Sequence, residues 1–315
     1  MEALRTIQSR DDARSEGLRG LGGLLFGVGV LVLLLRRTSF EDPWGDGALL
    51  IAWLVPALIL YGGGILAARA AEPKVWHSVW VVFGILFVYG TLIQFLTVID
   101  GDPDAPLNTV WTLCIVAGVA AGAAVFARVS FGWLLAGVAL AGAWLALWDE
   151  ILENGVADDI GTFRGLCMIA VLGLVAGAWM VQNRGRERGE AAELITAAGL
   201  VFLLGAGLVS LAGAFGSLFA PVAPAGAPGI AEPSLFWDLV LLGGSIALIA
   251  VGSFARLRGT IYVGAAGILT FVALVGGDLD DDSPAGKVVG WPLILLVLAL
   301  LAIVASLAQA RKASG

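Results

Sequence analysis

Carboxylates gather in three short polar segments of the 315-residue chain, namely "DGDPDAP", "DEILENGVADD" and "DLDDD". Carboxylate oxygens suit calcium, which accepts about six to eight oxygen ligands in a flexible geometry. The sequence therefore predicts, as one interpretation, that Ca²⁺ or another cation binds at these segments. Its candidate ligands are Asp149, Glu150, Glu153, Asp278, Asp280 and Asp282.

The Asp-x-Asp alternation in two of these segments does not continue as an EF-hand loop. Such a loop needs glycine at its sixth position and glutamate at its twelfth. The segment that begins at Asp100 has Ala105 and Trp111 there, and the one that begins at Asp278 has Ser283 and Val289. A cation would need ligands from several loops, and no resident cofactor is predicted. The simpler interpretation is a solvated acidic face that repels anions.

The elements that must position these acids are membrane helices. The chain is 59% hydrophobic and only 14% charged, whereas soluble domains carry about 25% charged residues. Its mean hydropathy is +0.94, and apolar runs of about 20 residues, the length of a membrane-spanning helix, recur along it. These features predict an all-α integral membrane protein in contact with the lipid bilayer.

We expect ten transmembrane helices built from repeated helical hairpins. A cytoplasmic segment (1–18) would precede a transmembrane domain (19–310), and a short cytoplasmic tail (311–315) would follow it. The predicted spans are 18–35, 48–68, 76–99, 107–127, 131–149, 163–182, 192–220, 236–255, 259–277 and 288–309.

The basic residues indicate how these spans are oriented. Lys and Arg are enriched in cytoplasmic loops, and most of the 18 basic residues fall in alternate loops that include both termini. Both termini are therefore expected to be cytoplasmic, in the cytoplasmic membrane of a bacterium. The exceptions lie on the outer side among the acids, where we expect them to form ion pairs: Arg36, Arg37, Arg164 and Lys287.

Polar side chains within the spans are neutral and few. Thr91, Gln94 and Thr97 follow one another at intervals of three, so they share one helix face. One interpretation is the wall of a polar path for a solute, and the other is hydrogen bonding between helices. Charged groups inside a membrane would mark an ion or proton path, and the middle of the spans contains essentially none.

Two segments resemble each other at a distance of 128 residues. "FARVSFGWLLAGVALAGAW" begins at Phe126 and "FARLRGTIYVGAAGILTFV" begins at Phe254, and an acidic segment follows each. This similarity favours a parallel internal repeat of 107–182 and 236–309. Chance alignment of apolar sequence is the alternative.

The sequence favours a protein without a catalytic site. His77 is its one histidine, and Cys114 and Cys167 lie in apolar runs, so a zinc cluster lacks ligands. We therefore expect a scaffold, sensor or partner subunit that binds a membrane protein or a second copy of itself, and no nucleic acid. A transporter or channel with an acidic outer vestibule is the first alternative. An outer-face enzyme that modifies lipids, with Asp149 or Glu150 as its acid or base, is the second.

Overall fold

All elements of the computed structural model are helices within the residues it describes, which are 2–39, 44–70, 74–152, 155, 159–183, 188–208 and 235–277. In chain order they are α1 (Glu2–Ser39), α2 (Asp46–Ala57), η1 (Leu58–Gly62), α3 (Gly63–Ala70), α4 (Val75–Val98), α5 (Pro106–Phe126), α6 (Phe131–Ile151), α7 (Ile160–Asn183), α8 (Arg188–Leu203), η2 (Leu204–Leu208), α10 (Leu235–Ala255) and α11 (Arg258–Gly277). The helices η1 and η2 are π-helices.

Eight described segments are long and apolar enough to cross a membrane, and they correspond to the first eight predicted spans. The second of them joins α2, η1 and α3 into one segment, Asp46–Ala70, and the seventh joins α8 to η2. The ninth predicted span coincides with α11, whose apolar stretch Arg258–Val272 is shorter. The tenth, 288–309, lies outside the described residues.

The second span changes its helical form where a proline interrupts it. Pro56 lies inside α2, and the five-residue π-helix η1 begins two residues later. Because proline removes one backbone donor, a local change to wider turns keeps the remaining backbone groups paired. In η1 the hydroxyl of Tyr61 donates to the carbonyl of Val119 on α5 at 2.8 Å. The backbone of Tyr61 also lies against Gly84 of α4, where a Cβ would come within 2.5 Å of it.

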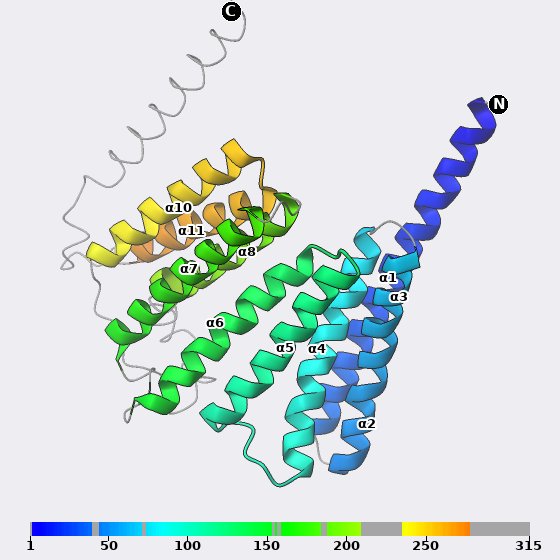
Figure 1. Cartoon of the computed structure of the whole chain (residues 1–315), viewed down its shortest axis with the longest axis horizontal. Helices are drawn as coiled ribbons and strands as arrows, with labels where there is room; N and C mark the ends of the chain where they lie inside the picture. Colours follow the sequence, from blue (N-terminus) through cyan, green and yellow to red (C-terminus); the bar gives the residue numbers. More distant parts are fainter. Residues whose placement is uncertain are drawn as a thin grey trace, which may run out of the picture.

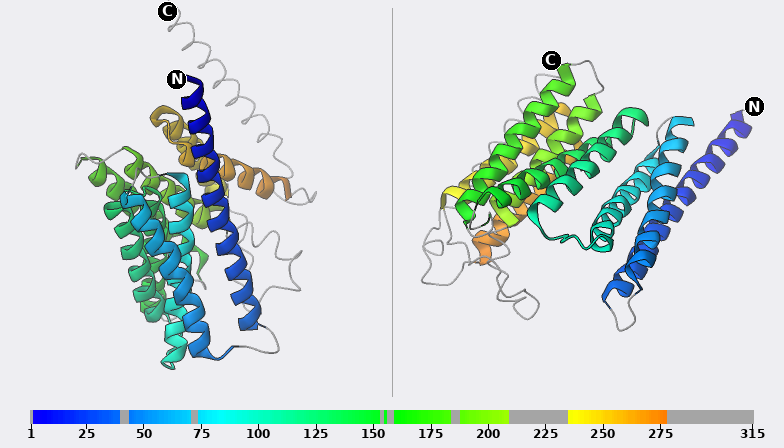
Figure 2. Two further views of the ribbon diagram at one scale, coloured as in Figure 1. Left: turned by 90° about the vertical axis from the view of Figure 1, so that its right-hand side faces the viewer. Right: turned by 60° about the horizontal axis from the view of Figure 1, so that its bottom comes forward.

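The helices pack as a row in which each buried cluster joins neighbours (Figure 1). One cluster joins α1, α2 and α4, and the next joins α3 and α4 to α5 and α6. A third cluster joins α6 to α7 and α8, and the last joins α8 and η2 to α10 and α11. The helix α6 therefore connects the first part of the chain to the second, as the rotated views also show (Figure 2).

Two of the hairpins turn on an arginine in the left-handed backbone region. Arg128 has φ of 54° between α5 and α6, and Arg256 has φ of 59° between α10 and α11. Both are the third residue of the sequence Phe-Ala-Arg. A left-handed residue after the last turn ends a helix and lets the chain reverse. The two similar sequences therefore make the same kind of turn.

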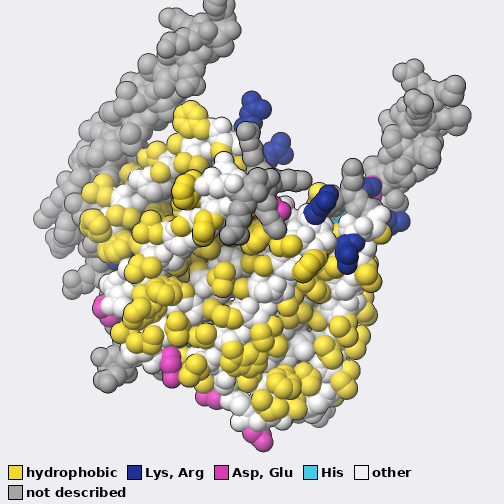
Figure 3. All heavy atoms as spheres, in the orientation of Figure 1, with side chains coloured by type: hydrophobic (Ala, Val, Ile, Leu, Met, Phe, Trp, Pro, Cys, Tyr) yellow, Lys and Arg dark blue, Asp and Glu magenta, His cyan; other side chains and the backbone are white. Residues whose placement is uncertain are grey.

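Acids are concentrated at one end of the spans and basic residues at the other (Figure 3). The division is not complete, because Arg36, Arg37 and Arg164 lie at the first end and Glu16 and Glu190 at the second. We call one end the acidic end, because it carries Asp100, Asp102, Asp104, Asp149, Glu150, Asp159 and Asp238. We call the other the basic end, because it carries Arg69, Lys74, Arg128, Arg256 and Arg258. Exposed apolar side chains occupy the surface between the two ends, as expected of a surface that faces lipid.

Candidate functional site

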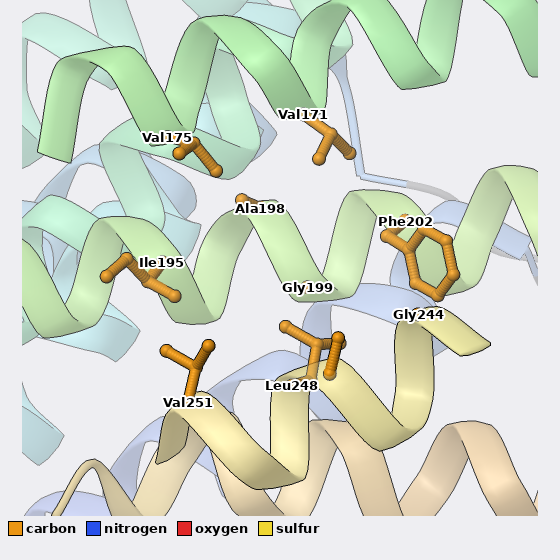
Figure 4. A pocket seen from close by; sticks show the side chains of 10 residues that line it. Val171, Val175, Ile195, Ala198, Gly199, Phe202, Gly244, Leu248 and Val251 are labelled. Carbon is orange, nitrogen blue, oxygen red and sulfur yellow. The ribbon is translucent and has the colours of Figure 1, made fainter. Parts of the chain in front are cut away.

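An apolar cavity of about 280 Å³ lies between α7, α8 and α10 (Figure 4). We call it the slot and define it by its lining residues. These are Val171 and Val175 of α7, Ile195, Ala198, Gly199 and Phe202 of α8, and Gly244, Ala247, Leu248 and Val251 of α10. Figure 4 shows side chains of α7 and α10 facing each other across α8.

The slot exists because α7 and α10 approach the α8–η2 span from different sides. Helix α7 packs along both α8 and η2, whereas α10 packs mainly on η2 and α11. The ring of Phe202 closes the gap towards the acidic end, where it lies against Gly244 so closely that a Cβ there would come within 2.3 Å of it. Beyond this contact, Ala198 and Gly199 leave α8 without bulky side chains to fill the space.

The slot opens towards the lipid-facing surface and lies in the middle of its three spans. Val175 is 45% exposed and Val251 is 47% exposed. Every lining side chain is hydrocarbon, so the slot offers no hydrogen-bond partner, no charge and no nucleophile. Its chemistry is therefore restricted to binding an apolar group by dispersion and close packing.

A buried arginine lies between the same helices at the acidic end. Arg164, the fifth residue of α7, is only 4% exposed. Its guanidinium lies 4.9 Å from the centre of the Trp237 ring, and it interacts electrostatically with Asp238 of α10. A cation over an aromatic face gains more when both are removed from water. The contact joins α7 to α10 beyond the closed end of the slot.

The arginine and the slot are about one turn and a half to two turns of helix apart. Val171 follows Arg164 by seven residues, and Gly244 follows Asp238 by six. At about 1.5 Å of rise per residue, these separations are roughly 10 Å and 9 Å. The buried arginine and the apolar slot therefore lie at different levels along the same two helices, α7 and α10.

No protein-family model, curated protein or solved structure matches this chain. The slot and the buried arginine are therefore interpreted from their own geometry and chemistry.

The three polar residues predicted to line a path lie in different environments on α4. The hydroxyl of Thr91 donates to the carbonyl of Phe87 at 2.7 Å, and that of Thr97 donates to Ile93 at 3.3 Å. Gln94 is buried and its amide nitrogen lies 3.5 Å from both the carbonyl and a carboxylate oxygen of Asp46 on α2. Both threonines thus bond to their own helix, and Gln94 joins two helices.

The predicted cation ligands fall partly outside the described residues. Asp149 and Glu150 lie in the last turn of α6, at the acidic end. Glu153, Asp278, Asp280 and Asp282 are outside the described part of the chain, as is Lys287. Within the described part, no three His, Cys, Asp or Glu side chains lie close enough together to hold a metal ion. A cation at these acids stays a prediction.

Asp159 has a local role at the start of α7. Its carbonyl accepts the backbone N–H of Phe163, and its carboxylate accepts the backbone N–H of Gly161, both at 2.9 Å. The hydroxyl of Thr162 also donates to this carboxylate. The hydrogen bonds from Thr162 and Gly161 hold the pKa of Asp159 below its ordinary value of 3.8. Asp159 is thus an ionised cap of α7.

The other two arginines that were predicted to lie on the outer side are at the end of α1. Arg36 and Arg37 are both exposed, and the guanidinium of Arg37 lies 5.4 Å from the centre of the Trp44 ring. The predicted ion pairs of these two residues with the outer acids stay a prediction. Within the described residues, Arg37 therefore has an aromatic neighbour, Trp44.

Sequence reasoning did not find the slot, because its lining comes from three spans and has no polar signature. Hydrophobic periodicity cannot distinguish a valine that faces lipid from one that faces a cavity. The burial of Arg164 was also missed, although one signal was present. Arg164 lies just inside one predicted span, and Trp237 and Asp238 lie together at the start of another. A charged residue inside a span needs a partner, so this pattern could have predicted their contact.

Proposed function

We propose that this chain is a non-catalytic membrane protein that acts as a scaffold, sensor or partner subunit by binding an apolar group within the bilayer. The slot between α7, α8 and α10 is the observation that carries this proposal. A cavity lined only by hydrocarbon, open to lipid and about 280 Å³ in volume, suits recognition of an apolar group. It offers nothing for acid–base or nucleophilic chemistry.

The placement of the polar residues supports the same proposal. A transport path needs polar groups that face a shared space. On α4, the hydroxyls of Thr91 and Thr97 are instead bonded to their own helix, and Gln94 lies beside Asp46. The threonine hydroxyls are thus satisfied within their own helix and Gln94 joins two helices, which is a common use of polar residues in membrane proteins.

We further propose ten spans with both termini in the cytoplasm of a bacterium and the acidic end outside. The separation of the acidic and basic ends supports this orientation, since Lys and Arg favour the cytoplasmic side. The tenth span would be 288–309, which is apolar along its length.

Purification from native membranes in a mild detergent tests the proposal. We expect mass measurement of the intact particle to show this chain with a bound apolar molecule, a protein partner in fixed proportion, or a second copy. Purified chain reconstituted in liposomes should not move ions or small solutes. Flux by the pure chain that disappears in Gln94→Ala would instead establish a transporter and contradict the proposal. Turnover of an added phospholipid by the pure chain would contradict it as well.

A further inference from the structure

We propose that His77 is a pH-dependent switch at the basic end, which holds the start of α1 against α4 while its imidazole is neutral and releases it when the imidazole is protonated. The inference goes beyond the proposed binding function, because it concerns α1 and α4 and does not involve the slot. Three features of the described residues carry it, and they are the hydrogen bond that His77 accepts, its burial, and the contacts that surround it.

His77 caps the first turn of α4 with a nitrogen that has to be unprotonated. Its Nδ1 accepts the backbone N–H of Lys74 at 2.8 Å, and its own backbone N–H donates to the carbonyl of Lys74 at 3.0 Å. The imidazole thus takes the place that glutamate or glutamine has in a capping box. Since an accepting nitrogen carries no proton, the neutral ring has its proton on Nε2. Protonation turns Nδ1 into a donor and breaks the cap.

The surroundings of His77 do not favour a charged ring. His77 is only 1% exposed, and within the described residues its Nε2 has no hydrogen-bond partner. A buried charge without partners is costly, and the amino-terminal end of a helix also disfavours a cation. Protonation therefore favours a conformation in which the first turn of α4 has opened to water.

Other ionisable groups lie on the elements next to His77. They are Glu16 and Arg19 of α1, Arg69 of α3, Lys74 before α4 and Arg128 after α5, and Glu72 lies outside the described residues. Among these, Lys74, Glu16 and Arg19 act electrostatically on the imidazole. Glu16 is the one described acid of this set, so a test of the switch has to separate its titration from that of His77.

The first turn of α4 also holds α1 in place. The side chain of Lys74 forms an ion pair with Glu16 of α1. Trp76 lies beside His77, with their ring centres 3.8 Å apart, and it packs on α1 at Gly20, where a Cβ would come within 3.4 Å of it. Because both contacts start from residues next to the cap, loss of the hydrogen bond between Lys74 and His77 disturbs both of them.

Release of these contacts would free the beginning of α1. The helix begins at Glu2, fourteen residues before Glu16, so about 21 Å of it precede the contact. Figure 1 shows this part of α1 projecting from the row of helices. One turn further along α4, the indole N–H of Trp80 donates to the carbonyl of Arg19 at 3.1 Å. That bond lies beyond the cap, so the projecting part can move while the rest of α1 stays packed on α4.

The distance between two spin labels tests this movement. The labels would be attached at Ser9→Cys in the projecting part of α1 and at Phe126→Cys, an exposed position at the end of α5. The full chain would carry alanine in place of its two free cysteines and would be studied in lipid nanodiscs. We expect a narrow distance distribution at about pH 8 that becomes broad by about pH 4.5, a range that includes the ordinary histidine pKa of about 6.5. A distribution that stays the same throughout this range would overturn the inference.

Two variants identify the group that titrates. Glutamine at position 77 can still accept the N–H of Lys74, as in a capping box, but does not titrate. His77→Gln should therefore keep the narrow distribution throughout the range. Glu16→Gln removes the acid and leaves the imidazole, so its distribution should still broaden as the pH falls. A response that persists in His77→Gln, or that disappears in Glu16→Gln, would overturn the inference.

Nuclear magnetic resonance of ¹⁵N-labelled histidine gives a second readout without any change at position 77. The chain has a single histidine, so the imidazole signals belong to His77. At high pH we expect the neutral form with its proton on Nε2, and we expect the signals of the charged form to appear over the pH range in which the spin-label distance broadens. A proton on Nδ1 at high pH, or charging of the ring without movement of α1, would overturn the inference.

Discussion

Arg164 is buried, so neighbouring protein groups and not water must compensate its positive charge. It is 4% exposed near the start of α7, with its guanidinium 4.9 Å from the centre of the Trp237 ring and Asp238 nearby. An exposed ion pair contributes little to stability, whereas a desolvated cation depends on its neighbours. Arg164 therefore links α7 to α10 and sets the polar level from which the depth of the slot is measured.

The Arg164–Trp237 contact should appear as a coupling energy. We expect Arg164→Gln and Trp237→Leu each to lower the free energy of unfolding in mixed micelles. The double variant should lose less than the sum of the two, with a coupling of about 0.5–2 kcal/mol. Strict additivity of the two losses would show that the ring does not stabilise the cation.

Asp159 should make the stability of α7 depend on pH. Its folded-state pKa lies below 3.8, so ionisation stabilises the fold fully above the unfolded pKa. That contribution is lost as pH falls through the folded pKa, below 3.8. We expect Asp159→Ala to unfold at a lower temperature than the parent chain at pH 6, and the difference to shrink as the pH is lowered through this range.

Asp159→Asn is the matched control for this prediction. An amide oxygen can still accept hydrogen bonds from Gly161 and Thr162 but does not ionise in this range. This variant should keep the cap and lose its part of the pH dependence. A gap between the parent chain and Asp159→Ala that stays constant with pH would contradict the role of the ionised form.

At the level of elements, close contacts between helices depend on small residues. Gly132 of α6 lies against α5, where a Cβ would come within 2.4 Å of the carbonyl oxygen of Ala120 and 3.0 Å of the nitrogen of Ala124. Both neighbours are backbone atoms, so a larger side chain must push the two helices apart. Gly118 of α5 has no described atom within 4 Å of a Cβ placed there.

These two glycines give a matched pair of substitutions. We expect Gly132→Ala to lower the free energy of unfolding by about 1–3 kcal/mol, as overpacking does. Gly118→Ala should be neutral or slightly stabilising, because alanine favours a helix more than glycine does. Equal effects of the two changes, measured under the same conditions, would show that α5 and α6 do not approach as closely as described.

The helices also show which features the hydrophobic pattern of the sequence predicts and which it does not. Long apolar runs predicted the helices, because a backbone in lipid must satisfy its own hydrogen bonds. The π-helices η1 and η2 were not predicted, although Pro56, two residues before η1, was a local signal for a change of helical form. Their close contacts, of Tyr61 with Gly84 and of Gly205 with Cys167, join residues far apart in the sequence. The shared left-handed arginines Arg128 and Arg256 agree with the similarity noticed in sequence, whereas duplication of the longer ranges stays a prediction.

For the whole molecule, the sequence predicted a helical protein with membrane-compatible spans but did not predict the slot. The class follows from composition alone, but the slot depends on how three spans converge. Its residues, such as Val175, Ala198 and Ala247, are ordinary for lipid-facing or packed helices. The predicted site residues are polar, whereas the cavity in the structure is apolar.

Orientation of the whole molecule can be tested with two single cysteines. The background chain would carry alanine in place of Cys114 and Cys167, which are both free. A membrane-impermeant maleimide applied to intact cells should label Asp102→Cys at the acidic end and should not label Arg256→Cys at the basic end. Labelling of the second variant alone would reverse the proposed topology.

The central claim is that the slot binds a specific apolar group in the native membrane. Photocrosslinking from a benzophenone side chain at Val175, which lines the slot, tests it most directly. Leu172 is the control, because it is 69% exposed on the same helix and does not line the slot. We predict one dominant adduct from position 175, which Ala247→Phe removes, and a mixture that mirrors the bulk lipids from position 172. The same mixture from both positions would contradict the account.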